Sequence, residues 1–281
     1  TESGTVYAIG GSNVESASPG SELISEHVST PATPVASPVA QISLSPIGEF
    51  SGGNDSLNGP DGMAFNDAGN LYIVDTRNER IVVVDPNGAV LRTWGEPGAG
   101  PGQFDFSQGD FFVGFIAIQG NHVYVADTRN NRIQQFDLNG TFVRAWGGPG
   151  SGDGQFDEPG GLAIDQKGRV WVADFGNNRL QIFDTEGNYI ETWGGSSTPG
   201  NFLLGPNAIA IDKAGNVYVS SDTNDAVYKF DSDGNVAGQF GDLHVFATAW
   251  SIAADADGQI FASDNTRHLG HVFTPDGTLI A

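Results

Sequence analysis

The chain has 281 residues, of which 34 are acidic and 12 basic, so its formal net charge at pH 7 is −22. This charge repels nucleic acid, which proteins bind through Lys and Arg, and we therefore exclude nucleic acid as a partner. The absence of Cys excludes disulfides and thiolate metal sites. No apolar run approaches the roughly 18 residues that span a bilayer, so we expect no direct membrane insertion.

Residues 1–58 are the least regular part of the sequence. Residues 4–9 and 41–50 have a strand-like pattern, whereas residues 16–38 are rich in Ser, Pro and Thr, and proline removes donors from a β-ladder. We interpret residues 1–58 as an irregular first repeat with a Ser/Pro/Thr-rich insertion. Because the chain begins without Met, we expect that an export signal or anchor has been removed and that the protein is extracellular or belongs to the cell envelope.

Residues 59–281 contain five clear copies of one pattern. Each copy has four short runs of alternating apolar residues, separated by turns rich in Gly, Asp and Asn, which is typical of an antiparallel meander. An aspartate after the second run recurs at intervals of roughly 42–52 residues, a repeat length typical of propeller blades. These aspartates are Asp75, Asp127, Asp174, Asp222 and Asp264.

Side-chain size along each copy agrees with a ring of blades. The first run carries Ala at one equivalent position in every copy, as expected for the crowded innermost strand, and the outer run ends in an aromatic residue followed by Gly. We predict an all-β propeller of four-stranded antiparallel blades that forms a single domain over residues 1–281. Dividing the chain length by about 47 residues predicts six blades, with five as the alternative.

The repeated motifs resemble those of the NHL-repeat family of propellers. They read Gly-x-Ala-hydrophobic-Asp, then Gly-x-Val-Tyr/Trp-Val-Ala-Asp, then Asn-Asn-Arg-hydrophobic-Gln-x-Phe, then Trp-Gly, and they recur in register over residues 50–281. The resemblance implies extracellular sensor and scaffolding roles, including ectodomains tethered to bacterial signalling proteins.

The loops after the second runs meet on one face of the predicted ring and divide into fixed and variable positions. Asp75, Asp127 and Asp174, with Arg80, Arg132 and Arg179, repeat and are expected to tie loop to strand. Variable positions on a fixed scaffold favour recognition, and we take as ligand-binding candidates Arg77, Arg129, Phe175, Asn224 and Arg267.

The start of each first run is expected to surround the mouth of the central channel. Asp61, Asn207 and Trp250 stand there as further ligand-binding candidates, while two other copies have Gly. Trp250 either plugs the channel or stacks on a ligand. Amidating lyases with similar repeats carry zinc-binding histidines at this position, and here none of the five residues is His, which disfavours zinc.

The sequence therefore predicts a non-catalytic module, without a cofactor or metal, that binds a protein, peptide, glycan or small ligand on its loop face as a monomeric domain. The competing interpretation is an enzyme of the lactonase or lyase type with Ca²⁺ or Mg²⁺ at the channel mouth. Asp61 and Asn207 are the polar groups placed to begin such a site.

Overall fold

The structure is a computed structural model that describes residues 56–108, 111–112, 114–194, 203–231, 234–241, 245–255 and 257–280. Nearly all of the predicted irregular first repeat, residues 1–58, lies outside this part of the chain. The described residues form antiparallel β-sheets and two single-turn 3-10 helices, η1 (Thr76–Asn78) and η2 (Thr128–Asn130).

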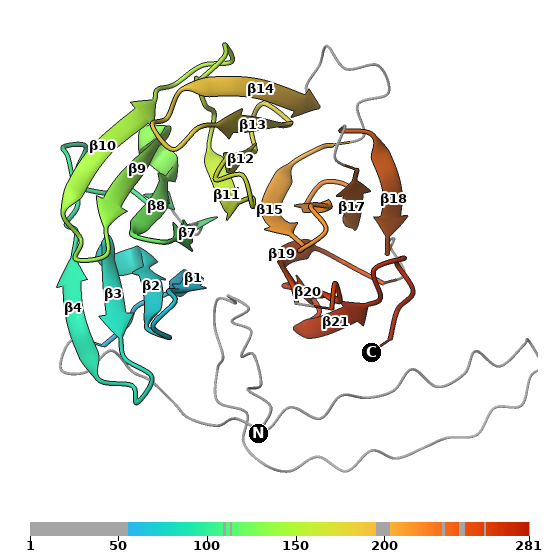
Figure 1. Ribbon diagram of the computed structural model, residues 1–281, viewed down its shortest axis with the longest axis horizontal. Coiled ribbons are helices and arrows are strands. Elements are labelled where there is room, and N and C mark those ends of the chain that lie inside the picture. The colour runs from blue at the N-terminus through green and yellow to red at the C-terminus, as the bar shows by residue number, and fades with distance from the viewer. Residues whose placement is uncertain are drawn as a thin grey trace, which may run out of the picture.

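Four sheets have four strands each, ordered along the chain from the axis outwards (Figure 1). The first blade contains β1 (Pro60–Phe65), β2 (Leu71–Asp75), β3 (Arg80–Val84) and β4 (Val90–Trp94). The second contains β7 (Phe115–Gln119), β8 (His122–Asp127), β9 (Arg132–Asp137) and β10 (Phe142–Gly147). The third contains β11 (Pro159–Ile164), β12 (Val170–Asp174), β13 (Arg179–Phe183) and β14 (Tyr189–Gly194).

The last two blades repeat this order, but the fifth is less complete. The fourth contains β15 (Pro206–Ile211), β16 (Val217–Ser221), β17 (Ala226–Phe230) and β18 (Val236–Phe240). The fifth contains β19 (Ala249–Ala254), β20 (Ile260–Asp264) and β21 (Leu269–Phe273), followed by an isolated bridge between Phe273 and Leu279. A small hairpin, β5 (Ser107–Gln108) and β6 (Phe111–Phe112), precedes the second blade.

The structure therefore has five blades, and the expectation of six is wrong. That expectation divided the whole chain by the repeat length and so counted residues 1–58 as a blade. The first strand of the described residues begins at Pro60, and the five sheets correspond to the five clear repeats.

The innermost strands β1, β7, β11, β15 and β19 lie side by side around the axis. Glycine permits this close approach where β11 meets β15. A Cβ added to Gly161 would lie 2.5 Å from the Asn207 carbonyl oxygen and 2.6 Å from Ala208 Cα. The inner ends of the third and fourth blades are therefore set by backbone contact.

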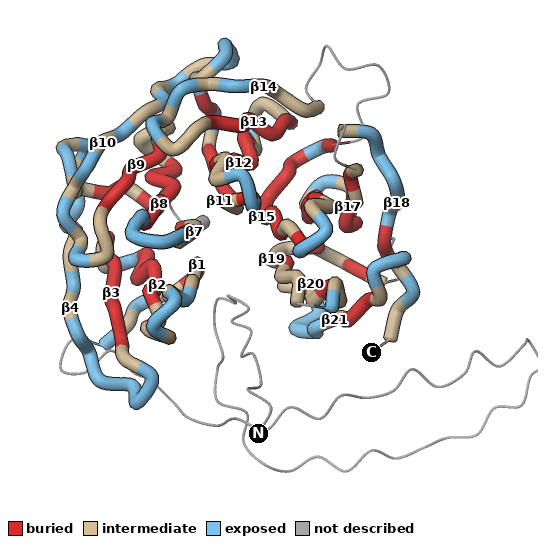
Figure 2. The backbone as a smooth tube through the Cα atoms, in the orientation of Figure 1, coloured by how far each residue is buried: buried red, intermediate tan, exposed pale blue. Residues whose placement is uncertain are grey.

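Four clusters of Leu, Ile, Val, Ala and aromatic residues each fill the wedge between two neighbouring blades, and a smaller fifth cluster lies on the first blade. Trp171 of β12 packs edge-on against Trp193 of β14 at 4.6 Å between ring centroids, and Trp193 contacts Phe230 of the fourth blade. Figure 2 shows the second and third strands of the first four blades largely buried, and the outer strands β4, β10 and β18 mostly exposed or intermediate. Aromatic residues thus join each blade to the next.

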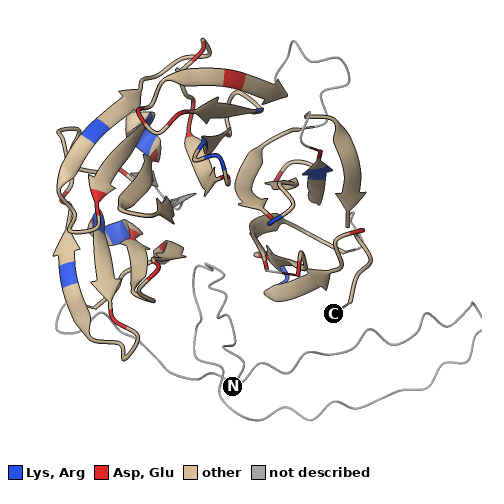
Figure 3. Ribbon diagram, viewed as in Figure 1, with Lys and Arg blue, Asp and Glu red and all other residues tan. Residues whose placement is uncertain are grey.

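Charged side chains lie mainly in turns and loops (Figure 3). In the described part of the chain, no helix has the length and hydropathy needed to cross a membrane.

Candidate functional site

In three blades a buried aspartate at the end of the second strand pairs with an arginine at the start of the third. The distance from Arg Nε to Asp Oδ2 is 2.7 Å in Arg80–Asp75, Arg132–Asp127 and Arg179–Asp174. The other carboxylate oxygen accepts an amide of the loop entering the blade, as Asp174 does from Asp157 N at 2.8 Å. Burial raises the pKa of Asp127 and Asp174, and hydrogen bonds from the loop and the arginine oppose this effect. The predicted structural role of these six residues is confirmed.

The fourth blade has other residues at the positions of this ion pair. Strand pairing places Ser221 opposite Pro206 and Ala226, as it places Asp174 opposite Pro159 and Arg179. Ser221 and Ala226 therefore occupy the aspartate and arginine positions. The sequence-based equivalence of Asp222 with Asp174 is wrong by one residue, because pairing register decides which face a side chain occupies. Asp222 instead corresponds to Phe175, one position into the loop.

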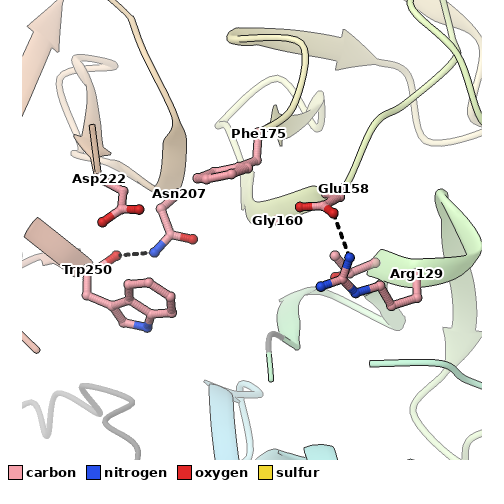
Figure 4. Close-up of a pocket in the computed structure, with 8 residues that line it drawn as sticks. Arg129, Glu158, Gly160, Phe175, Asn207, Asp222 and Trp250 are labelled. Atoms are coloured by element: carbon pink, nitrogen blue, oxygen red, sulfur yellow. Dashed lines mark hydrogen bonds and ion pairs between the residues drawn. The ribbon is translucent and has the colours of Figure 1, made fainter. Parts of the chain in front are cut away.

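The loops gather eight residues around one cavity of about 310 Å³, which we call the loop-face pocket. The second and third blades contribute Thr128, Arg129, Glu158, Gly160 and Phe175, and the fourth and fifth contribute Asn207, Asp222 and Trp250. Figure 4 shows the Trp250 indole on one side of the pocket, Arg129 and Glu158 on the other, and Phe175 between them. Four candidates from the sequence are thus brought together: Arg129, Phe175, Asn207 and Trp250.

Arg129 and Glu158 form an ion pair within the pocket. The distance from Arg129 Nη1 to Glu158 Oε1 is 2.6 Å, and 42% of the Glu158 side chain remains exposed. Glu158 has a φ of 55°, a left-handed conformation that glycine adopts at the corresponding positions 59 and 205. Its amide donates to Asn131 Oδ1 at 2.8 Å. A neighbouring blade therefore holds Glu158 in a conformation unusual for a residue with a side chain.

The opposite side of the pocket contains a carboxylate without a counter-ion. No hydrogen bond or ion pair joins the Asp222 carboxylate to another side chain among the described residues, and burial, followed by the charge of Asp225, raises its pKa. Asn207, by contrast, is buried, and its Nδ2 donates to the Trp250 carbonyl oxygen at 3.0 Å. This bond fixes the backbone from which the Trp250 ring projects.

The other four candidates do not line the loop-face pocket. Arg77 is exposed, with its side chain over Gly59. Asn224 is bonded within its own blade, with Nδ2 donating to the Tyr228 hydroxyl at 3.0 Å. Arg267 donates from Nη1 to the Val245 carbonyl oxygen at 2.8 Å.

Asp61 lines a different cavity, a central channel of about 170 Å³ that is bounded by the inner strands. Burial raises the pKa of Asp61 to about 7, although a hydrogen bond from the Gly114 amide at 3.2 Å opposes this effect. Asn207 does not line this channel, so the two groups proposed for a divalent-ion site are not in one cavity. Within the described ranges, no group of three or more His, Cys, Asp or Glu side chains is arranged to hold a metal. Trp250 borders both cavities.

Comparison with known proteins finds several partial matches. The model of the SMP-30/gluconolactonase/LRE-like region matches residues 116–205. NHL repeat-containing protein 2 of Gallus gallus is 42% identical over 69 residues, which are 24% of this chain and 10% of that protein. These matches support an NHL-repeat β-propeller. The protein brain tumor of Drosophila melanogaster is 27% identical over 123 residues, which are 44% of this propeller and 11% of that protein. The chain therefore spans about a tenth of the length of these relatives.

Solved structures of similar shape include an enzyme and a protein complex. A catalytically inactive variant of virginiamycin B lyase from Staphylococcus aureus, solved with quinupristin, has a TM-score of 0.60 at 14% identity, covering 78% of this propeller and 68% of that chain. A structure of a nidogen/laminin complex has a TM-score of 0.61 at 13% identity and 80% coverage of both chains. At these identities the likeness shows the fold alone.

The repeat pattern of this propeller did not identify Glu158 and Asp222 as pocket residues. The signal for Asp222 was present: aligning Val217 with Val170 places Ser221 at the aspartate position and Asp222 within the loop. The sequence signal for Glu158 was weaker. It is a charged residue before Pro159, whereas the first and fourth blades have Gly59 and Gly205 before the equivalent proline.

Proposed function

We propose that this propeller is a non-catalytic recognition module that binds a protein or peptide partner through its loop-face pocket. The observation that carries the proposal is the convergence of Arg129, Phe175, Asn207 and Trp250, from four different blades, on one cavity of about 310 Å³. This volume is at the lower end of the range for binding pockets. Two aromatic walls with a few polar groups provide contact area together with orientation.

The loops themselves separate framework from recognition. Buried Asp–Arg pairs hold the loops of the first three blades in one geometry. The next positions differ from blade to blade and reach the pocket, as Thr128, Phe175 and Asp222 do. A rigid scaffold with variable loop residues is typical of binding surfaces.

A peptide-display selection against the full chain tests this proposal. The expected result is a set of enriched peptides whose binding requires the pocket aromatics. We would compare Phe175→Thr, which copies Thr128, and Trp250→Asn, which copies Asn207, after verifying their folding by thermal melting. Each change should weaken binding by roughly tenfold, the scale of one to two kcal/mol from a buried aromatic contact. Enriched peptides that bind both variants as tightly as the original chain would overturn the proposal.

The match to the SMP-30/gluconolactonase/LRE-like region favours a second candidate, a metal-dependent lactonase- or lyase-type enzyme. Its test is the divalent-metal content of the chain purified without chelator, together with lactone hydrolysis. A stoichiometric ion that is lost in Asp61→Asn, with hydrolysis lost in parallel, would favour the enzyme over the recognition module. Metal content and hydrolysis at background level would reject it.

A further inference from the structure

The charges around the loop-face pocket are unbalanced. Glu158 and Asp222 are acidic, Arg129 is the one basic residue in the lining, and Arg129 is already paired with Glu158 at 2.6 Å. The carboxylate of Asp222 therefore remains for a ligand. The one-residue offset in the fourth blade is its cause, because Ser221 occupies the buried position that aspartate has in the other four blades.

The surroundings of Asp222 suit a cation that carries an apolar stem. Trp250 lines the pocket on the same side, and its indole ring is drawn towards the cavity in Figure 4. Phe175, half-buried, forms another wall. Aromatic faces attract ammonium and guanidinium groups, and an adjacent carboxylate adds a charge-assisted hydrogen bond.

We propose that the pocket binds an alkylammonium group, and specifically a lysine side chain of a protein partner, between the Asp222 carboxylate and the faces of Trp250 and Phe175. This inference rests on the proposed recognition function and defines its ligand class. The formal charge of −22 supports it, because such a surface attracts basic segments and increases their rate of association at low salt. The stem of lysine would cover the apolar walls while its ammonium meets the carboxylate.

The proposal can be tested by titrating the full chain with three probes and following them by ligand-observed NMR. The first probe is a capped pentapeptide with lysine between glycines, the second is the same peptide with an acetylated lysine Nζ, and the third is n-butylamine. We expect acetylation to weaken binding roughly tenfold, because it removes the charge while keeping the stem. We also expect the lysine peptide to bind more tightly than butylamine.

The fourth blade offers a matched pair of variants. Asp222→Asn removes the pocket carboxylate with little change in shape. It should weaken binding of the lysine peptide roughly tenfold, to the level of the acetyl-lysine peptide. Asp225→Asn removes one charge from the same loop at a residue outside the pocket lining, where φ is 49° and Asn178 occupies the equivalent position with φ 55°. It should weaken binding much less than Asp222→Asn does, because the pocket carboxylate stays in place and loses only the repulsion of its neighbour.

The results separate this inference from the proposed function. Equal binding of the lysine and acetyl-lysine peptides, or no effect of Asp222→Asn, would overturn the cation class, while loss of both peptides in Trp250→Asn would leave the recognition pocket in place. Equal binding of butylamine and the lysine peptide would overturn the protein origin of the ammonium group. Binding of all probes unchanged in Trp250→Asn and Phe175→Thr would overturn both proposals.

Discussion

Individual buried carboxylates have different roles in this propeller, and their partners decide which. Asp174 accepts hydrogen bonds from Arg179 Nε, Asn177 and the Asp157 amide. Ser221 and Ala226 show that a blade can also form without the ion pair. The pair is therefore one of several arrangements at this position: in the fifth blade the buried Asp264 stands opposite Leu269, with Arg267 of the loop 3.9 Å away.

The Asp174–Arg179 pair gives the first prediction. Arg179→Ala leaves a carboxylate with 0% side-chain exposure without its cation, and should lower the free energy of unfolding by about 3 kcal/mol. The double change Asp174→Ser with Arg179→Ala copies the fourth blade and should lose less than the sum of the single changes. Urea unfolding measures these values. Arg144→Ala, at an exposed contact to Glu186, is the control and should cost under about 1 kcal/mol. Additive single losses would contradict the coupling.

Asp61 gives a prediction on pH. Its pKa is about 7 in the folded chain and about 3.9 in an unfolded one, so between these values the folded state holds a proton that the unfolded state releases. The contribution of Asp61 to the free energy of unfolding is fully present below the unfolded-state pKa and is lost as the pH rises through about 7. The limiting slope is about 1.4 kcal/mol per pH unit. Among the described residues lining the channel, Asp61 is the one ionisable side chain.

The measurement is the free energy of unfolding from pH 4 to pH 8. Asp61→Asn should remove the slope and be more stable than the original chain at pH 8. Asp67→Asn, which removes an exposed carboxylate from the following turn, should keep it. Identical slopes in the original chain and in Asp61→Asn would show that Asp61 titrates normally.

Contacts between strands of neighbouring blades, rather than single side chains, set the shape of the inner ring. Gly161 on β11 lies against the backbone of β15, so Gly161→Ala should cost about 1–3 kcal/mol by overpacking and should weaken ligand binding, since it displaces Asn207. Gly270→Ala on β21 meets no atom within 4 Å and should be neutral. Thermal melting compares the two variants. Equal melting temperatures would mean that β15 can move away without cost.

The strands were predictable from the sequence because their alternation, turns and aromatic ends repeat five times. The ion pair between Asp174 and Arg179, and its equivalents in the first two blades, were predictable for the same reason. The position of Asp222 was misassigned, because the fourth repeat has Ser221 at the aspartate position and its aspartate one residue later. Strand pairing settles this register. Asp61 and Asn207 stand at equivalent positions of the repeat but border different cavities, because the loop-face pocket is lined by the second to fifth blades and Asp61 belongs to the first.

At the scale of the whole molecule, the repeat pattern predicts the type of fold better than the number of blades. Each blade is specified locally by its own three or four strands, so five clear copies predict five sheets. The count for the entire chain required an assumption about residues 1–58 that no repeated motif supports. The resemblance to NHL-repeat propellers depends on the same five copies and not on the number of blades, and the comparisons support this resemblance.

The charge of −22 predicts two opposite effects of salt. Raising NaCl from about 20 mM to about 500 mM screens repulsion among surface carboxylates, so the melting temperature should rise by a few degrees.

The same rise in NaCl should weaken binding of the lysine peptide, because it screens the attraction to Asp222. Buried Asp–Arg pairs are screened much less and should not reverse the first effect. Calorimetry and NMR titration over one salt series measure both effects. A larger rise with CaCl₂ than with NaCl at equal ionic strength would indicate bound divalent ion and favour the enzyme candidate. A melting temperature that falls with NaCl would contradict the dominance of surface repulsion.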